Sequence, residues 1–198
     1  MHCHLSGRWF FVMTILQIET LNNPILRKKT RQITNFDEDL QRLIDDMIET
    51  MRSANGVGLA GPQVNQPLRV TVIETLPERD EEGIEIEGSR ELIVLINPKI
   101  VSESRKKVEG IEGCLSIPGW VGEVERHQSI RVRAQDRHGR KIRLRLNDWT
   151  ARIVQHEIDH LDGILYIDRL TAPENLWREE DYFKEQEEEV EQDEVAIG

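Results

Sequence analysis

Two histidines separated by three residues, with a glutamate beside the first, are the side chains of this sequence best suited to chemistry. His156, Glu157 and His160 form the pattern His-Glu-x-x-His within residues 155–163. On a helix, residues four apart lie on one face, so the two imidazoles can bind one transition-metal ion. Glu157 can then take a proton from a water that the ion activates. The spacing therefore predicts metal-assisted hydrolysis of an amide-like bond.

A third metal ligand is needed, and Cys114 is the strongest candidate. It lies within Glu-Gly-Cys-Leu-Ser, residues 112–116, where Gly113 lets the backbone approach a ligand closely. Two imidazoles and one thiolate form a ligand set that leaves a fourth position open. Two other interpretations of Cys114 stay open: a nucleophile that uses His156 or His160 as its base, and a small buried apolar residue.

A glycine-rich segment, Gly-Val-Gly-Leu-Ala-Gly-Pro-Gln-Val, spans residues 56–64. It lacks the lysine of a phosphate-binding loop and opens no helix, which argues against nucleotide binding. It is either a turn after a helix or an edge whose backbone pairs with an extended peptide. In the second case Gln63 can donate its side-chain N–H to a developing oxyanion.

The helix that carries the two histidines is predicted between about Trp149 and Leu161. Asn147 or Asp148 can cap its start, and Gly163 ends it. Apolar side chains make its body, so the helix is expected to be buried. They are Ala151, Ile153, Val154, Ile158 and Leu161.

Two further helices are predicted on either side of this one. Apolar residues at helical spacing predict the first from near Phe36 to Met51, with Thr34 or Asn35 as its cap and Asn55-Gly56 at its end. The second begins near Pro173 and continues into an acidic tail.

Four strands are predicted between the first helix and the metal-binding helix, at residues 69–74, 91–96, 129–135 and 141–146. Asn97-Pro98 closes the second strand, and residues 136–139 form a hairpin turn between the last two. The acidic segment 75–90 is expected to be a long loop or a protruding hairpin. These elements predict an α+β fold: antiparallel strands packed around a central metal-binding helix, with an N-terminal and a C-terminal helix.

The composition places most of the acidity at one end. The net charge of the 198 residues is −11, but residues 171–198 hold eleven acids and two bases, so the other 170 residues carry only −2. No strongly basic face is visible in the composition, and no direct nucleic-acid binding is expected. No apolar run is long enough for a membrane span. Cys3 and Cys114 form no disulfide framework, which favours a reducing, cytoplasmic location.

The chain is expected to have three parts. Residues 1–12 are predicted to be a disordered extension or a wrongly assigned start, with translation beginning at Met13. His2-Cys3-His4 is predicted to bind metal only adventitiously. Residues 13–170 form the catalytic domain. Residues 171–198 form an acidic C-terminal helix or tail.

Three segments together resemble one family, peptide deformylase. Residues 56–63, 112–116 and 155–163 are similar to its three motifs, in order, and the resemblance covers about Ile15 to Leu170. It implies a role for each matching residue. The metal ligands would be Cys114, His156 and His160, and Glu157 would be the general acid and base. Gln63 and the backbone N–H of Leu115 would donate to the oxyanion. Val57, Gly58 and Gly113 would make backbone contacts to the peptide.

The resemblance also implies a substrate and a metal. The substrate would be the N-formyl-methionyl end of nascent proteins, with formate released, and this makes a transient association with the ribosome plausible. One divalent ion is implied, Fe2+ in the family, with Zn2+, Ni2+ or Co2+ able to replace it. An apolar pocket for the methionine side chain would draw on Val57, Ile153 and Val154.

Two departures and two alternatives accompany this reading. Gly61 stands where the family usually has alanine, which predicts a more mobile loop, and the segment 75–90 is longer than usual. One alternative is a zincin-type endopeptidase that cuts unformylated peptides. The other is a binding protein with structural zinc; Glu157 and Gln63 argue against it, because a closed structural site needs neither.

Overall fold

The computed structural model describes residues 14–77 and 79–197, and side chains up to residue 188. The expectations for residues 1–12 and for a start at Met13 fall outside these residues. No helix in this part of the chain is long and apolar enough to cross a bilayer.

The described residues form three α-helices, as predicted: α1 (Glu38–Ser53), α2 (Asp148–Asp162) and α3 (Glu179–Ile197). Short 3-10 helices lie at η1 (Pro24–Arg27), η2 (Gly61–Val64) and η3 (Tyr166–Arg169). The predicted cap of the first helix was wrong by a few residues. Asp37 caps α1, because its carboxylate accepts the backbone N–H of Leu40 at 3.0 Å. At the end of α2, Gly163 adopts the left-handed conformation that was expected of it.

A five-stranded antiparallel sheet forms the larger layer, in the order β1-β2-β3-β8-β9. Its strands are β1 (Gly58–Ala60), β2 (Val70–Glu74), β3 (Leu92–Glu103), β8 (Ser129–Gln135) and β9 (Lys141–Asn147). The prediction that Asn97-Pro98 closes a strand was wrong, since β3 continues to Glu103. The register to β8 shifts between Ile96 and Lys99, and a proline is tolerated at such an irregularity.

The smaller strands were not predicted. Strands β10 (Leu176–Arg178), β6 (Ile117–Glu123) and β5 (Ile111–Cys114) form a three-stranded sheet in that order, and β4 (Lys107–Val108) pairs with β7 (Arg126–His127). The last helix therefore does not begin near Pro173. Residues 176–178 pair with β6 first, and the helix starts at Glu179.

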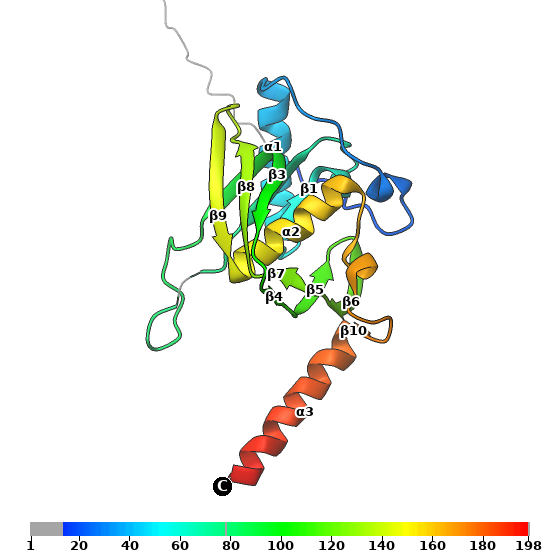
Figure 1. The fold of residues 1–198 in the computed structure, drawn as a ribbon, viewed down its shortest axis with the longest axis vertical. Coiled ribbons are helices and arrows are strands. Elements are labelled where there is room, and N and C mark those ends of the chain that lie inside the picture. The colour runs from blue at the N-terminus through cyan, green and yellow to red at the C-terminus, as the bar shows by residue number, and fades with distance from the viewer. Residues whose placement is uncertain (1–13, 78, 198) are drawn as a thin grey trace, which may run out of the picture.

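Helix α2 lies at the centre of the molecule, across the five-stranded sheet and beside the smaller one (Figure 1). Its residues Ala151, Val154 and Ile158 pack with the inner face of β2, β3, β8 and β9. A second cluster joins α1 to β1 and β2, and a third joins Ile117 and Val124 to Tyr166. The arrangement confirms the predicted α+β fold with antiparallel strands around a central helix.

The connection between β2 and β3 projects from the body of the protein (Figure 1). Arg79 and Glu85 form an isolated antiparallel bridge within it. The segment is exposed along most of its length, so the expectation of a protruding hairpin is confirmed.

Candidate metal centre

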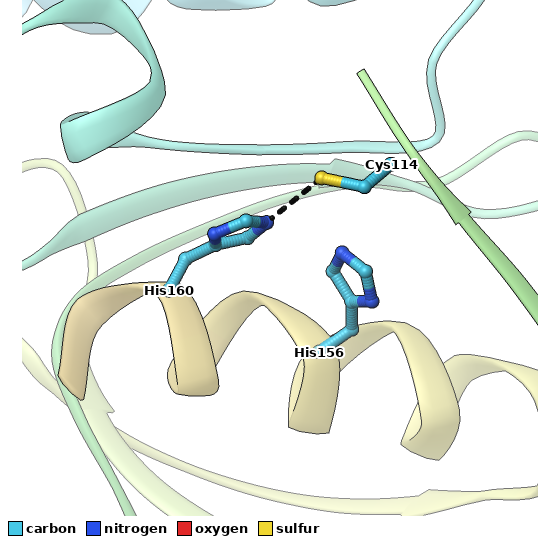
Figure 2. Close-up of side chains that lie close together, drawn as sticks. All are labelled: Cys114, His156 and His160. Atoms are coloured by element: carbon cyan, nitrogen blue, oxygen red, sulfur yellow. Dashed lines mark hydrogen bonds between the residues drawn. The ribbon is translucent and has the colours of Figure 1, made fainter. Parts of the chain in front are cut away.

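Cys114, His156 and His160 converge on one point (Figure 2). Cys114 ends β5, and the two histidines lie one turn apart on α2. Their potential ligand atoms all lie within 4.8 Å of one another, and Cys114 Sγ is 3.2 Å from His160 Nε2. The structure therefore brings together the three residues named from the sequence, although two of them are more than forty positions from the third.

The donor set fits a divalent transition metal. His156 donates its Nδ1–H to the Glu112 carboxylate at 2.9 Å, which leaves Nε2 to face Cys114. Burial raises the pKa of the Cys114 thiol, but the neighbouring His160 and His156 more than offset this and lower it well below its usual range. The thiolate is the form that binds metal. In the described part of the chain this group has three members, so one coordination position stays open, as in catalytic sites.

Glu112 sits in a buried network of charges that sequence reasoning missed. Arg126 donates to both Glu112 oxygens at 2.9 Å, and Arg152 Nη1 donates to one of them at 2.8 Å. Burial opposes ionisation of Glu112, but the bonds from Arg126 and His156 hold its pKa well below the ordinary value. An ionised Glu112 thereby fixes the ring of His156, a candidate metal ligand. The one available signal was Arg152, a charged residue within the apolar body of α2.

Glu157 is buried, only 3% exposed, and held between two neighbours. Thr71 Oγ1 donates to its Oε2 at 3.4 Å. On the other side Gly58 approaches so closely that a Cβ there would lie 2.3 Å from Glu157 Oε1. Burial raises the pKa of Glu157, and the charges of His160 and His156 oppose that rise. The fold thus holds a carboxylate of increased basicity beside the metal ligands.

Gln63 has a fixed orientation. Its Oε1 accepts the Ala60 N–H at 2.8 Å, and its Nε2 donates to Ser116 Oγ at 3.2 Å and lies 3.6 Å from Cys114 Sγ. Its amide nitrogen therefore points toward the candidate metal ligand Cys114, the orientation that the predicted oxyanion donor needs. The N-terminal segment ties the two loops together, because Glu19 N–H donates to Gln63 O and Leu21 N–H donates to Ser116 O.

A cavity of about 480 Å³ opens beside these side chains, a size that suits a short peptide. Its lining includes eight of the nine residues named from the sequence: Val57, Gly58, Gln63, Gly113, Cys114, Leu115, His156 and Glu157. The ninth, His160, is fully buried and does not line it. Ile153 lines the cavity, but Val154 packs in the core. The prediction that Val154 contributes to a methionine pocket was therefore wrong.

Two strand edges border the cavity. β1 is an edge strand of the five-stranded sheet and β5 is an edge strand of the three-stranded sheet, so each pairs with a neighbouring strand on one side only. Gly58 of β1 and Gly113 of β5 both line the cavity. An extended peptide can therefore add to either edge through backbone hydrogen bonds.

Gly61 is buried at the start of η2. A Cβ at this position would lie 2.6 Å from the Leu68 carbonyl oxygen and 2.9 Å from that of Gln66. The glycine therefore lets residues 66–68 pack directly on the loop. An alanine at this position would disturb the close packing. The greater mobility expected of this loop stays a prediction.

Comparisons with known proteins agree with this geometry. The family model for polypeptide deformylase matches residues 15–176. Peptide deformylase 2 of Nostoc sp. is 47% identical over 170 residues, which cover 85% of this chain and 93% of that one. The crystal structure of peptide deformylase from Thermotoga maritima superposes with a TM-score of 0.71 at 36% identity, over 80% of this chain and 99% of that one.

A second solved structure is that of a class I type b peptide deformylase from Acinetobacter baumannii with Met-Ala-Ser bound. It is 32% identical, with a TM-score of 0.71 over 80% of this chain and all of that one (100%). The range matched by the family model includes the three motifs, the five-stranded sheet and α2. The chain belongs to the polypeptide deformylase family.

Proposed function

We propose that this site hydrolyses the formyl group of N-formyl-methionyl peptides and releases formate. One observation carries the proposal: a buried glutamate, an oriented glutamine amide and a Cys-His-His ligand set meet at one cavity. Membership of the deformylase family supports it. Neither an endopeptidase nor a structural zinc protein requires this particular combination.

The substrate is proposed to bind as an added strand between β1 and β5. Backbone groups of Val57, Gly58 and Gly113 would pair with the peptide, and Val57 and Ile153 would contact the methionine side chain. The Met-Ala-Ser bound to the Acinetobacter baumannii enzyme begins with the residue that deformylation would expose, which supports this assignment. A formyl hydrogen occupies little space, so a tight site excludes larger acyl groups.

Cys114, His156 and His160 are proposed to hold one divalent ion. When bound, such an ion polarises the formyl oxygen and makes a nucleophile of water near neutral pH. The family resemblance favours Fe2+, and the ligand chemistry also suits Zn2+, Ni2+ and Co2+.

Glu157 is proposed to move the protons. Its raised basicity and its position beside the ligands suit it to take a proton from the attacking water and return it to the leaving nitrogen. Gln63 Nε2 and the backbone N–H of Leu115 would donate to the oxygen on which negative charge develops. Removing a donor of this kind costs about 3–4 kcal/mol in the transition state.

The products test this function directly. Incubation with formyl-Met-Ala should yield formate and Met-Ala in equal amounts, and acetyl-Met-Ala should be consumed far more slowly, because a site that fits closely around the formyl hydrogen would exclude the extra methyl group. Formate would be measured by a coupled dehydrogenase assay and Met-Ala by chromatography. Cleavage of casein or of the Met–Ala bond, without formate, would instead establish the endopeptidase alternative.

Replacing Gly58 by alanine should impair turnover without loss of metal. The added Cβ would overlap the Glu157 carboxylate, so this side chain must move away from Thr71. We expect kcat to fall at least about tenfold, since a displaced general base loses much of its contribution. Gly119→Ala is a matched control at the cavity rim, where a Cβ meets no atom, although its φ of 75° adds some strain. An unchanged kcat in Gly58→Ala would show that Glu157 tolerates displacement.

Nascent proteins are the proposed source of the substrate, which would place the enzyme in the cytoplasm with transient access to the ribosome. Residues 13–170 are proposed as the catalytic domain and 171–198 as an acidic extension. The segment 176–178 belongs to the β10-β6-β5 sheet, and Glu179 reaches the rim of the cavity.

A further inference from the structure

The outer face of the five-stranded sheet presents cations that the metal site does not use. Side chains alternate along β8 and β9, and the exposed positions on one face include Arg131, Arg133, Arg143 and Arg145. The register sets Arg131 opposite Arg145 and Arg133 opposite Arg143. Lys99 of β3 is exposed and lies opposite Arg133. These five residues are called the basic face below.

The basic face is hollowed and faces away from the metal site. A depression of about 490 Å³ is lined by all four arginines together with Val101, which is 52% exposed. The alternate residues of β8, Ile130, Val132 and Ala134, point the other way and pack in one cluster with α2. A ligand on the basic face would therefore leave the catalytic cavity open.

These cations are not neutralised by neighbours. Within the described residues, none of the five forms an ion pair with an acid, whereas other exposed arginines such as Arg42 and Arg79 do. Like charges directly opposite each other on adjacent strands destabilise a sheet. Protection of an exposed edge explains charges on β9, the edge strand, but not on the interior strands β8 and β3. The unpaired like charges lower the stability of the sheet, which indicates an anionic ligand whose charge offsets this cost.

We propose that the basic face binds the phosphate backbone of RNA. Guanidinium groups offer several N–H donors that match phosphate oxygens, and alternate residues of a strand stand about 6.7 Å apart, so the two strands form a regular grid of donors. The basic face contains no aromatic side chain on which a base could stack, so the contact would be made to the backbone and be independent of sequence.

The choice of RNA rests in part on the proposed function. An enzyme that meets its substrate on nascent chains works beside an RNA-rich particle, and a basic face opposite the cavity would hold it there with the cavity free. The acidic residues of a second copy are the competing partner, since α3 begins with Glu179, Glu180 and Asp181. A helix that carries carboxylates on flexible side chains matches a rigid two-strand grid less well than a phosphate backbone does.

The test compares three double variants of the full chain with a labelled RNA duplex of arbitrary sequence. Arg131→Gln/Arg145→Gln should weaken RNA binding about tenfold at moderate salt and lower the slope of log affinity against log salt by about 2. Arg131→Lys/Arg145→Lys should keep most of that slope. Arg42→Gln/Arg79→Gln removes the same charge from ion-paired positions elsewhere and should bind like the parent.

Folding and catalysis are measured on the same preparations. Relief of a like-charge pair should leave the Tm of Arg131→Gln/Arg145→Gln equal to or above that of the parent. Turnover of free formyl-Met-Ala should be unchanged, so loss of RNA binding is separable from failure of the deformylase assignment. Arg133→Gln/Arg143→Gln serves as an independent pair if the first variant does not fold.

Two results would overturn the proposal. One is binding of the duplex by Arg131→Gln/Arg145→Gln with the affinity and salt slope of the parent. The other is that the parent protein does not bind RNA but self-associates, and that Arg131→Gln/Arg145→Gln no longer self-associates. The basic face would then bind the acidic segment of a second copy.

Discussion

Replacing Glu157 by alanine is expected to lower kcat for formyl-Met-Ala by about 10²- to 10⁴-fold, the usual contribution of a general acid–base group. The carboxylate is buried beside Thr71 and Gly58, whereas Glu112, the other acid that contacts the histidines, is bound by Arg126, Arg152 and His156. Metal content should stay at the parent level, because Glu157 is not among the three ligands. The measurement pairs formate release with metal analysis of the same sample.

Glu180→Ala provides the control for this variant. Glu180 is an exposed glutamate on α3, so its loss changes the net charge by the same amount without touching the cavity. We expect parent-like turnover from it. Parent-like turnover from Glu157→Ala would instead remove this residue from the mechanism.

Replacing Cys114 by serine is expected to deplete the bound metal. A serine hydroxyl stays protonated at neutral pH and is a poor ligand for a transition metal, whereas the histidines hold the Cys114 thiol in its ionised form. Loss of a residue that merely orients a ligand weakens metal binding about 10- to 100-fold, so loss of a ligand should reach about 100-fold or more. Metal per chain after dialysis is the measurement, and formate release should fall in parallel.

Cys3→Ser tests whether the effect is specific to Cys114, since these are the two cysteines of the chain. It should retain the metal content of the parent. Equal metal content in Cys114→Ser and the parent would show that the thiolate is not a ligand, and the interpretation of Cys114 as a buried apolar residue would return.

The parts of the site that are local in sequence could be predicted from residue spacing. His156 and His160 meet because four residues make about one helical turn, and Gly163 ends that helix because it accepts a positive φ. Cys114 and Gln63 come from other elements, and spacing alone left their roles open. Before the structure, only the resemblance of three motifs to one family assigned Cys114 and Gln63 to the same site as the histidines.

The short strands could not be predicted because they lack a periodic pattern. β6 contains Pro118 and two glycines within seven residues, and β10 has three residues whose strand conformation depends on pairing with β6. Pro98 was taken as the end of a strand, since the shift in register that accommodates it arises only from pairing with β8. Tertiary pairing decided each of these cases.

The clustering of basic side chains could not be predicted from the composition, for a related reason. Composition counts residues along the chain and indicated no basic face, but strand pairing gathers Arg131, Arg133, Arg143 and Arg145 on one side of the sheet. Packing between two of the smaller sheets likewise places Arg126 of β7 beside Glu112 of β5 in the interior. Such clusters depend on register, which a residue count does not contain.

We propose that one metal ion, held by Cys114, His156 and His160, supports hydrolysis of the formyl group. The most direct test is to prepare the native chain anaerobically, strip the metal stepwise with a chelator, and measure metal per chain and formate release from formyl-Met-Ala on each fraction. We expect about one ion per chain at full activity, since three protein ligands leave one open position on a single ion, and a rate that falls in proportion to occupancy. Full formate release from metal-free protein would show that hydrolysis does not depend on the metal.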